Sequence, residues 1–186
     1  YEQGRAFVQM EDSENAIKRY SLLVQRYPES ELSRRAANEI GLLYYQNDRY
    51  QEAIAAYKKV ITTYPGSAEA RLAQRDLKSI YVDLNKVDDY MAFASTIPGG
   101  AKFDVSERDS LTYTAAERAY MRGDIAGAKT SLTRYLQSFP QGAFSQIVAF
   151  AAARIFSYAM NRQHMLRGHI SVEKISADIT GYVSFE

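Results

Sequence analysis

Residues 36–65 read AANEIGLLYYQNDRYQEAIAAYKKVITTYP. Apolar side chains recur at helical intervals on both sides of Asn47-Asp48, which predicts two amphipathic helices joined by a tight turn. Pro65 should end the second helix, because its ring fixes φ and it has no N–H to donate. Small residues stand where the helices must cross closely and large ones fill the space between them: Ala37, Gly41 and Ala53 against Ile40, Tyr44, Tyr50, Tyr57 and Val60.

The same arrangement recurs at a fixed interval. Six earlier residues each precede their counterpart by 37 positions: Gly4, Phe7, Ala16, Tyr20, Leu23 and Pro28 correspond to Gly41, Tyr44, Ala53, Tyr57, Val60 and Pro65. A later set follows at an offset of 75: Ala116, Ala128, Leu132, Tyr135 and Pro140. We therefore divide the chain into repeats of about residues 1–29, 30–66, 67–104 and 105–141, with a degenerate terminal repeat or cap over 142–186.

Serine residues are expected to begin several of these helices, because a serine side chain can accept a hydrogen bond from an unpaired N–H of the first turn. Ser13, Ser30 and Ser67 are predicted to have this role, and Ser106 is expected to open the fourth repeat. The first helix of the second repeat should then span residues 30–46.

The third repeat departs from the pattern. Its first helix is predicted over residues 67–84, with one apolar face made of Leu72, Leu77, Ile80, Tyr81 and Leu84. Its second helix, residues 88–95, should be short, because Pro98-Gly99-Gly100 follows closely. Tyr90 occupies the small position, which predicts looser packing. The period nevertheless continues beyond this break, so we expect one continuous solenoid domain over residues 1–186.

The end of the chain fits the pattern least well. Residues 145–160 are predicted to be helical, whereas 179–185 alternate more like a strand or an extended end.

The order of small and large positions resembles the tetratricopeptide repeat, a helix–turn–helix unit of ~34 residues. The resemblance implies an all-α, right-handed solenoid of four to five stacked hairpins. The segments RYPESELSRRAANEIGLLYY and YPGSAEARLA are further similar to repeats of bacterial cell-envelope proteins, namely the periplasmic partner of the Tol-Pal system and the lipoprotein of the outer-membrane β-barrel assembly machinery. This implies a non-enzymatic adaptor, periplasmic or associated with the outer membrane; a cytoplasmic location is the alternative.

Composition excludes several kinds of site. The 186 residues include no cysteine, so thiolate metal sites, disulfides and thiol nucleophiles are absent. A net charge of +1 without charge blocks gives no indication of nucleic-acid binding. No apolar run approaches the ~20 residues of a membrane span. The chain starts with Tyr1 in mid-pattern, which we interpret as a fragment or a processed product.

No motif predicts catalysis, a cofactor or a metal. His164 and His169, the only histidines, are five residues apart rather than the four of a helical zinc motif. Asp88 and Asp89 are expected to begin a helix, where carboxylates interact well with the dipole. Arg122-Gly123-Asp124 matches an integrin-recognition tripeptide, but we interpret it as a turn, because Gly tolerates positive φ and Asp can cap the next helix.

A protein or peptide partner is expected on the concave face, which the first helix of each hairpin lines. Counting from Gly41, the outward positions of that face are Arg5, Gln9, Arg35, Asn38, Leu42, Tyr45, Gln46, Arg75, Ser79 and Val82. Arginine would bind carboxylates, Asn and Gln backbone amides, and Tyr apolar anchors; alternatively these are ordinary solvated residues. The Lys and Asn of a carboxylate clamp are missing, since Tyr1 and Arg5 occupy those places.

Two classes of function remain open. One is a protein-binding scaffold or adaptor. The other is an oligomerisation or accessory module of a larger enzyme or transporter complex, and self-association is compatible with both.

Overall fold

The computed structural model describes the backbone of residues 1–98 and 103–167, and the side chains as far as Ser157. All regular secondary structure in these ranges is helical, which confirms the predicted all-α fold. The chain divides into two compact units, Tyr1–Lys102 and Phe103–Glu186. The expectation of a single continuous domain stays a prediction.

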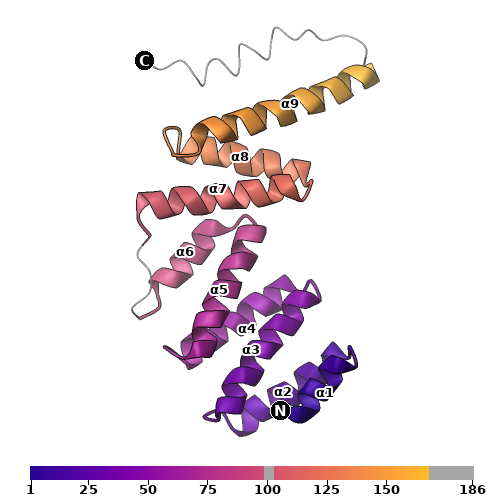
Figure 1. The fold of residues 1–186 in the computed structure, drawn as a ribbon, viewed down its shortest axis with the longest axis vertical. Helices are drawn as coiled ribbons and strands as arrows, with labels where there is room; N and C mark the ends of the chain where they lie inside the picture. The colour runs from indigo at the N-terminus through magenta and orange to yellow at the C-terminus, as the bar shows by residue number, and fades with distance from the viewer. Residues whose placement is uncertain (99–102, 168–186) are drawn as a thin grey trace. The chain divides into compact units, whose positions relative to one another are not determined.

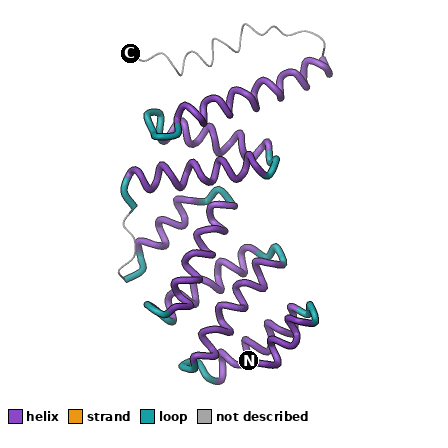
Figure 2. Tube along the Cα trace, viewed as in Figure 1, coloured by secondary structure: helices purple, strands orange, loops and turns teal. Residues whose placement is uncertain are grey.

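The first unit contains three helical hairpins. They are α1 (Glu2–Gln9) with α2 (Ser13–Arg26), α3 (Glu31–Gln46) with α4 (Tyr50–Thr63), and α5 (Ala68–Asp83) with α6 (Val87–Ser95). Each helix packs against its hairpin partner, and α2 on α3, α4 on α5 and α3 on α5 join successive hairpins. Short loops connect the helices (Figures 1 and 2). This stacking of repeated hairpins is the solenoid arrangement that the period predicts.

A tyrosine of each second helix lies directly on a glycine of the first helix in the first two hairpins. A Cβ on Gly41 would come within 2.7 Å of the Tyr57 ring, and one on Gly4 within 2.4 Å of the Tyr20 ring. Both rings are buried. The small positions predicted from the sequence therefore exist because an aromatic ring occupies the space that a side chain would fill.

The turn inside each hairpin has the same conformation. Glu11, Asp48 and Asn85 have φ of 58°, 57° and 55°, and Gly123 of the second unit has 74°. The N–H of the following residue returns to a carbonyl five positions earlier, as from Asp12 to Phe7 at 2.9 Å. This is a Schellman motif, which ends a helix with one residue in the left-handed region. Only the fourth turn has the glycine that such a φ favours.

Helix caps confirm part of the sequence interpretation and correct part of it. Ser30 accepts from the N–H of Leu32 at 3.2 Å and Ser67 from that of Ala70 at 3.0 Å, as predicted. Ser13 is not a cap: Asp12 accepts from the N–H of Asn15 at 3.1 Å, so the cap lies one residue earlier. A carboxylate at that position also interacts favourably with the positive end of the helix dipole.

The third hairpin corrects the predicted apolar face of α5. Leu72 is 42% exposed, whereas Ala70, Ala73, Leu77, Ile80 and Tyr81 are buried. Leu72 precedes Leu77 by five residues, which places it roughly 140° around the helix. The buried face of α5 therefore contains Ala70 and Ala73 in place of Leu72. The short helix α6 begins with Asp88 and Asp89 in its first turn, as expected.

The second unit contains α7 (Val105–Met121), α8 (Ile125–Ser138) and α9 (Ser145–Arg167). Asp104, not Ser106, caps α7: it accepts from the N–H of Glu107 at 2.8 Å, and the Glu107 side chain accepts in return from the Asp104 N–H at 3.1 Å. Helix α9 includes the predicted helical residues 145–160 and continues to Arg167. The predicted extended end over 179–185 lies outside the described residues.

A buried carboxylate organises this unit. Asp109 of α7 is 6% exposed and accepts the hydroxyl proton of Tyr135 from α8. Its other oxygen accepts from the N–H of Ala143 at 2.8 Å, and the Tyr135 hydroxyl accepts from the N–H of Phe144 at 3.1 Å. These bonds join α7, α8 and the loop before α9, and they provide the hydrogen-bond partners that a buried carboxylate requires.

Candidate functional site

The predicted binding residues belong to α1, α3 and α5, the first helix of each hairpin in the first unit; we call their surface the first-helix face. Arg5, Gln9, Arg35, Gln46 and Arg75 are exposed. Asn38, Leu42, Tyr45 and Ser79 are half-buried. These nine residues are thus at or near the surface, where a partner could contact them.

Val82 is an exception. Its side chain is only 3% exposed, and its neighbours Ile80 and Tyr81 are buried too. Because three successive residues are buried, this turn of α5 is covered on more than one side. The equivalent turn of α3 is more open, since Tyr45 is half-buried there. Val82 therefore belongs to the interior and not to the surface on which the sequence placed it.

Each exposed arginine of the first-helix face has an acidic neighbour on its own helix. The closest nitrogen–oxygen distances are 3.2 Å from Arg5 to Glu2, 2.5 Å from Arg35 to Glu31 and 2.9 Å from Arg75 to Asp76. Ion pairs between exposed side chains contribute little to stability. The guanidinium groups can therefore exchange these partners for an external carboxylate at small cost.

Arg5 and Arg35 lie near a group of residues from α1, α2 and α3. The rings of Tyr1 and Tyr20 are 5.5 Å apart, and the half-buried Glu39 of α3 lies beside them. Burial, followed by the charge of Glu39, raises the pKa of Tyr20 to about 12. Burial likewise raises the pKa of Glu39, an effect that the positive charge of Arg5 partly offsets.

A second group repeats this arrangement one hairpin later. Burial, then the charges of Asp76 and Glu39, raise the pKa of Tyr57. Tyr57 follows Tyr20 by 37 residues, and Asp76 follows Glu39 by the same interval. In both hairpins, therefore, a tyrosine of the second helix extends past its glycine, so that its hydroxyl faces a carboxylate on the first helix of the next hairpin.

Tyr45 connects α3 to α5. Its hydroxyl donates to Asp83 at 3.4 Å, and its ring meets the ring of Tyr50 edge-on at 5.9 Å between centroids. The side-chain oxygen of Asn38 is buried without a hydrogen-bond partner in the described part of the chain. Buried polar atoms of this kind are rare and are costly to leave unpaired.

Sequence reasoning missed three residues of this face. Glu39 and Asp76 are half-buried carboxylates, and Leu72 is an exposed apolar side chain. The period could have found them, since Leu72 follows Arg35 by 37 positions and Asp76 follows Glu39 by the same interval. The face therefore combines apolar, acidic and basic side chains.

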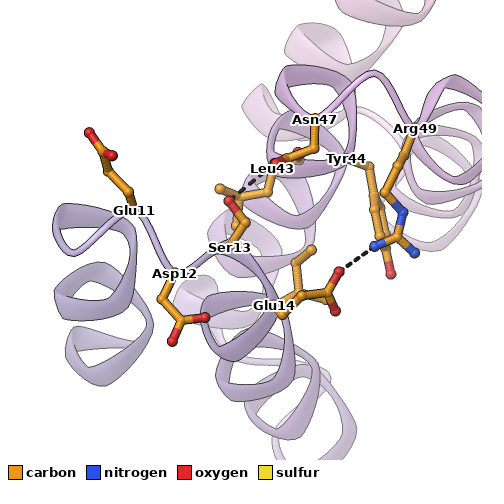
Figure 3. A pocket seen from close by; sticks show the side chains of 9 residues that line it. Glu11, Asp12, Ser13, Glu14, Leu43, Tyr44, Asn47 and Arg49 are labelled. Carbon is orange, nitrogen blue, oxygen red and sulfur yellow. Dashed lines mark hydrogen bonds and ion pairs between the residues drawn. The ribbon is translucent and has the colours of Figure 1, made fainter.

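A separate pocket of about 420 Å³ lies at the turn ends of the first two hairpins (Figure 3). Arg49 spans it, with 2.6 Å to Glu14, 2.9 Å to Glu52 and 4.6 Å to the centre of the Tyr44 ring. Asn47 donates to Ser13 at 3.1 Å. The polar side chains of the pocket thus bind one another and connect the first hairpin to the second. The pocket is lined by Glu11, Asp12, Ser13, Glu14, Ile17, Leu43, Tyr44, Asn47 and Arg49.

The tripeptide Arg122-Gly123-Asp124 forms a turn, as predicted. Gly123 has φ of 74°, and the Asp124 carboxylate accepts from the N–H of Gly127 at 2.9 Å at the start of α8. Its aspartate is therefore engaged as a helix cap.

Among the residues whose structure is described, no three His, Cys, Asp or Glu side chains gather as a metal site would require. None of the helices in these ranges combines the length and the apolar character of a membrane span. His169 lies outside the described residues, and so does the side chain of His164.

Residues 1–68, which contain the first two hairpins, match the family model of the tetratricopeptide repeat. The comparison with curated proteins gives no match.

Solved structures with similar folds include a tetratricopeptide repeat protein from Parabacteroides merdae, with 15% identity and a TM-score of 0.45; 90% of this chain is covered, and it spans 66% of that protein. The MamA RS-1 ArsTM double mutant has 11% identity and a TM-score of 0.44 over 89% of this chain and 93% of that one. A Podospora anserina protein of nearly identical TPR-like repeats has 13% identity and a TM-score of 0.41, over 97% and 91%. The family model thus matches the part of the chain that contains the hairpins α1–α2 and α3–α4.

Proposed function

We propose that this chain is a protein-binding scaffold whose first-helix face holds a segment of a partner protein. Tetratricopeptide repeats generally mediate protein–protein interactions, and the match over residues 1–68 supports such a role. The observation that carries the proposal is the composition of the face. It includes the exposed Leu72 and the half-buried Leu42 and Tyr45, together with the exposed Arg35 and Arg75. Apolar anchors surrounded by polar side chains are typical of interfaces.

The test is photo-crosslinking in the cells that make the protein. A photoreactive residue is placed at Arg35, Leu72 or, as a control, at Lys59, which is exposed on α4 away from this face. We expect the first two positions to give one common crosslinked protein and the control to give none. Identical products from all three positions, or no product from Arg35 and Leu72, would refute binding at this face.

We further propose that the partner belongs to a bacterial cell-envelope complex, which rests on the resemblance of residues 26–45 and 64–73 to envelope repeats. Fractionation before crosslinking tests this point separately. Recovery of the crosslinked product with envelope proteins supports it. Recovery with soluble cytoplasmic proteins would be compatible with the scaffold role but would contradict the proposed envelope location.

A role without catalysis is part of the same proposal, because tetratricopeptide repeats typically serve as scaffolds. The domain composition of the full-length gene product distinguishes the scaffold from the alternative, an accessory module of a larger complex. A catalytic or transport domain in the same polypeptide would favour it.

A further inference from the structure

Helix α9 of the second unit presents two large apolar side chains to solvent. Ile147 is 58% exposed and Phe150 is 67% exposed. Arg154, which is also exposed, follows Phe150 by four residues, so the three side chains share one face of the helix; we call them the α9 stripe. The side chains of α9 that belong to the core of this unit lie on a different face: Val148, Ala152 and Ile155.

Arg154 gives the α9 stripe a positive charge. Its guanidinium carbon lies 5.9 Å from the centre of the Phe150 ring, within the range of a cation–π contact. The sequence from Ile125 to Arg167, which includes α8 and α9, contains five Lys or Arg residues and no Asp or Glu. The exposed arginines of the first-helix face differ, because each has an acidic neighbour on its own helix. Neither α8 nor α9 can therefore supply a carboxylate to balance the charge of Arg154.

We propose that the α9 stripe binds an acidic amphipathic helix of a partner protein. Apolar side chains of that helix pack on Ile147 and Phe150, and a glutamate or aspartate beside them forms a two-pronged pair with Arg154. Since the guanidinium lies next to the Phe150 ring, one partner helix can contact both. The inference goes beyond the proposed function, because it concerns a different unit of the chain and does not depend on the first-helix face.

Two other occupants fit the α9 stripe less well. A second copy of the chain that paired α9 with α9 would bring like charges together, since this helix contains no acidic residue. Helices that lie on a membrane surface bury a broad apolar face. The stripe, in contrast, has only Ile147 and Phe150 as large apolar side chains, while the neighbouring apolar face of α9 is buried in the core. A narrow stripe of this kind matches the contact made by one helix.

The experiment titrates the isotope-labelled full chain with the peptide acetyl-AEELLEALLEELAA-amide and follows the amide resonances by NMR. A peptide with Gln in place of every Glu is the control for charge, and a peptide with Ala in place of every Leu is the control for apolar contact. We expect the acidic peptide to cause saturable shifts of α9 resonances. Both control peptides should bind at least about tenfold more weakly, because each lacks one of the two kinds of contact.

Variants of the chain locate the binding surface. Phe150→Ala and Arg154→Gln should each weaken binding of the acidic peptide at least about tenfold. The matched controls are Met121→Ala, a 78% exposed residue at the end of α7, and Lys129→Gln, whose ammonium lies 4.6 Å from the centre of the Phe156 ring. Phe156 is about 160° around α9 from Arg154, so Lys129 lies away from the stripe. Both controls should change the affinity less than about twofold.

Circular dichroism checks the folding of each sample, and Ile147→Ala is the second variant should Phe150→Ala fail to fold. Absence of binding, equal affinity for the Gln peptide, or an equal loss in the control variants would overturn the inference. Three results would assign the stripe to another occupant and overturn it as well. They are binding to vesicles of equal parts phosphatidylcholine and phosphatidylserine that Phe150→Ala abolishes, self-association that Phe150→Ala abolishes, and displacement of the acidic peptide by a synthetic peptide of residues 168–186.

Failure of this inference is distinguishable from failure of the proposed function. Crosslinks at Arg35 and Leu72 report on the first unit, so they should be the same in Phe150→Ala as in the wild type. If the acidic peptide does not bind and these crosslinks persist, the scaffold role of the first-helix face stands and only the α9 stripe is wrong.

Discussion

Removing the hydroxyl of Tyr135 should destabilise the second unit strongly. Tyr135→Phe leaves one oxygen of the buried Asp109 without its donor and the N–H of Phe144 without its acceptor. A hydrogen bond to a charged group contributes ~1.5–3 kcal/mol, and a buried group left unpaired costs about 1–3 kcal/mol. Since the two effects overlap, we expect a loss of roughly 3 kcal/mol in the free energy of unfolding, about a hundredfold in the equilibrium constant.

The assay must report on the second unit alone, because the two units need not unfold together. Hydrogen exchange followed by mass spectrometry measures the protection of α7 and α8 peptides in the full chain. Tyr113→Phe is the matched control. Its ring stacks on Phe144 at 4.2 Å, whereas its hydroxyl donates to the exposed Glu117. That control should change the free energy by less than about 0.5 kcal/mol.

Two results would refute this reasoning. One is a loss below about 1 kcal/mol for Tyr135→Phe, and the other is a loss equal to that of the control. A double-mutant cycle with Asp109→Asn adds a further check, because residues in one hydrogen-bond network should show coupling of about 0.5–3 kcal/mol.

Three further predictions concern the first unit. Gly41→Ala should cost about 1–3 kcal/mol by overpacking the Tyr57 ring, whereas Ala55→Leu on the exposed side of α4 should leave the melting temperature unchanged; equal effects would mean that the helix crossing lies elsewhere. Glu11→Gly should stabilise by ~0.5–1 kcal/mol in urea denaturation, because Glu11 has φ of 58°; a destabilised variant would contradict this source of strain. Tyr20, whose pKa burial raises to about 12, holds its proton more tightly in the folded state than in the unfolded state, so its contribution to stability is complete below pH ~10 and is lost as the pH rises toward 12. Ultraviolet absorbance should show one tyrosine fewer titrating above pH 12 in Tyr20→Phe, and an identical profile would argue against a buried hydroxyl.

The hairpins were predictable from the sequence because they depend on local periodicity and on the size of single residues. Gly41 and Tyr57 indicated a close helix crossing, and their separation along the chain is fixed by the length of one hairpin. Ser30 and Ser67 were predictable as caps, because capping depends on the residue type at the helix start. Asp12 was missed since two adjacent residues there, Asp and Ser, both serve well as caps.

The polar groups of the candidate site were harder to predict. Glu39 looks like any glutamate of an amphipathic helix, yet it is half-buried in the folded chain. Likewise, nothing local in the sequence distinguishes Asp109 from the neighbouring charged residues. Its role depends on Tyr135, which is 26 positions away, and on the loop at Ala143. Such pairings arise from tertiary packing and leave no period in the chain.

The pairing of each tyrosine with a carboxylate of the next hairpin gives the first unit a direction. Tyr20 lies near Glu39 of the second hairpin, and Tyr57 lies near Asp76 of the third, so each tyrosine interacts with a carboxylate of the hairpin that follows it. A duplicate of residues 30–66 inserted after Gly66 would preserve both kinds of junction, and the array could be lengthened from within. Inverting the order of two hairpins would break them. In the third hairpin Ala94 stands at the corresponding position and has no hydroxyl, so lengthening by the same rule stops there.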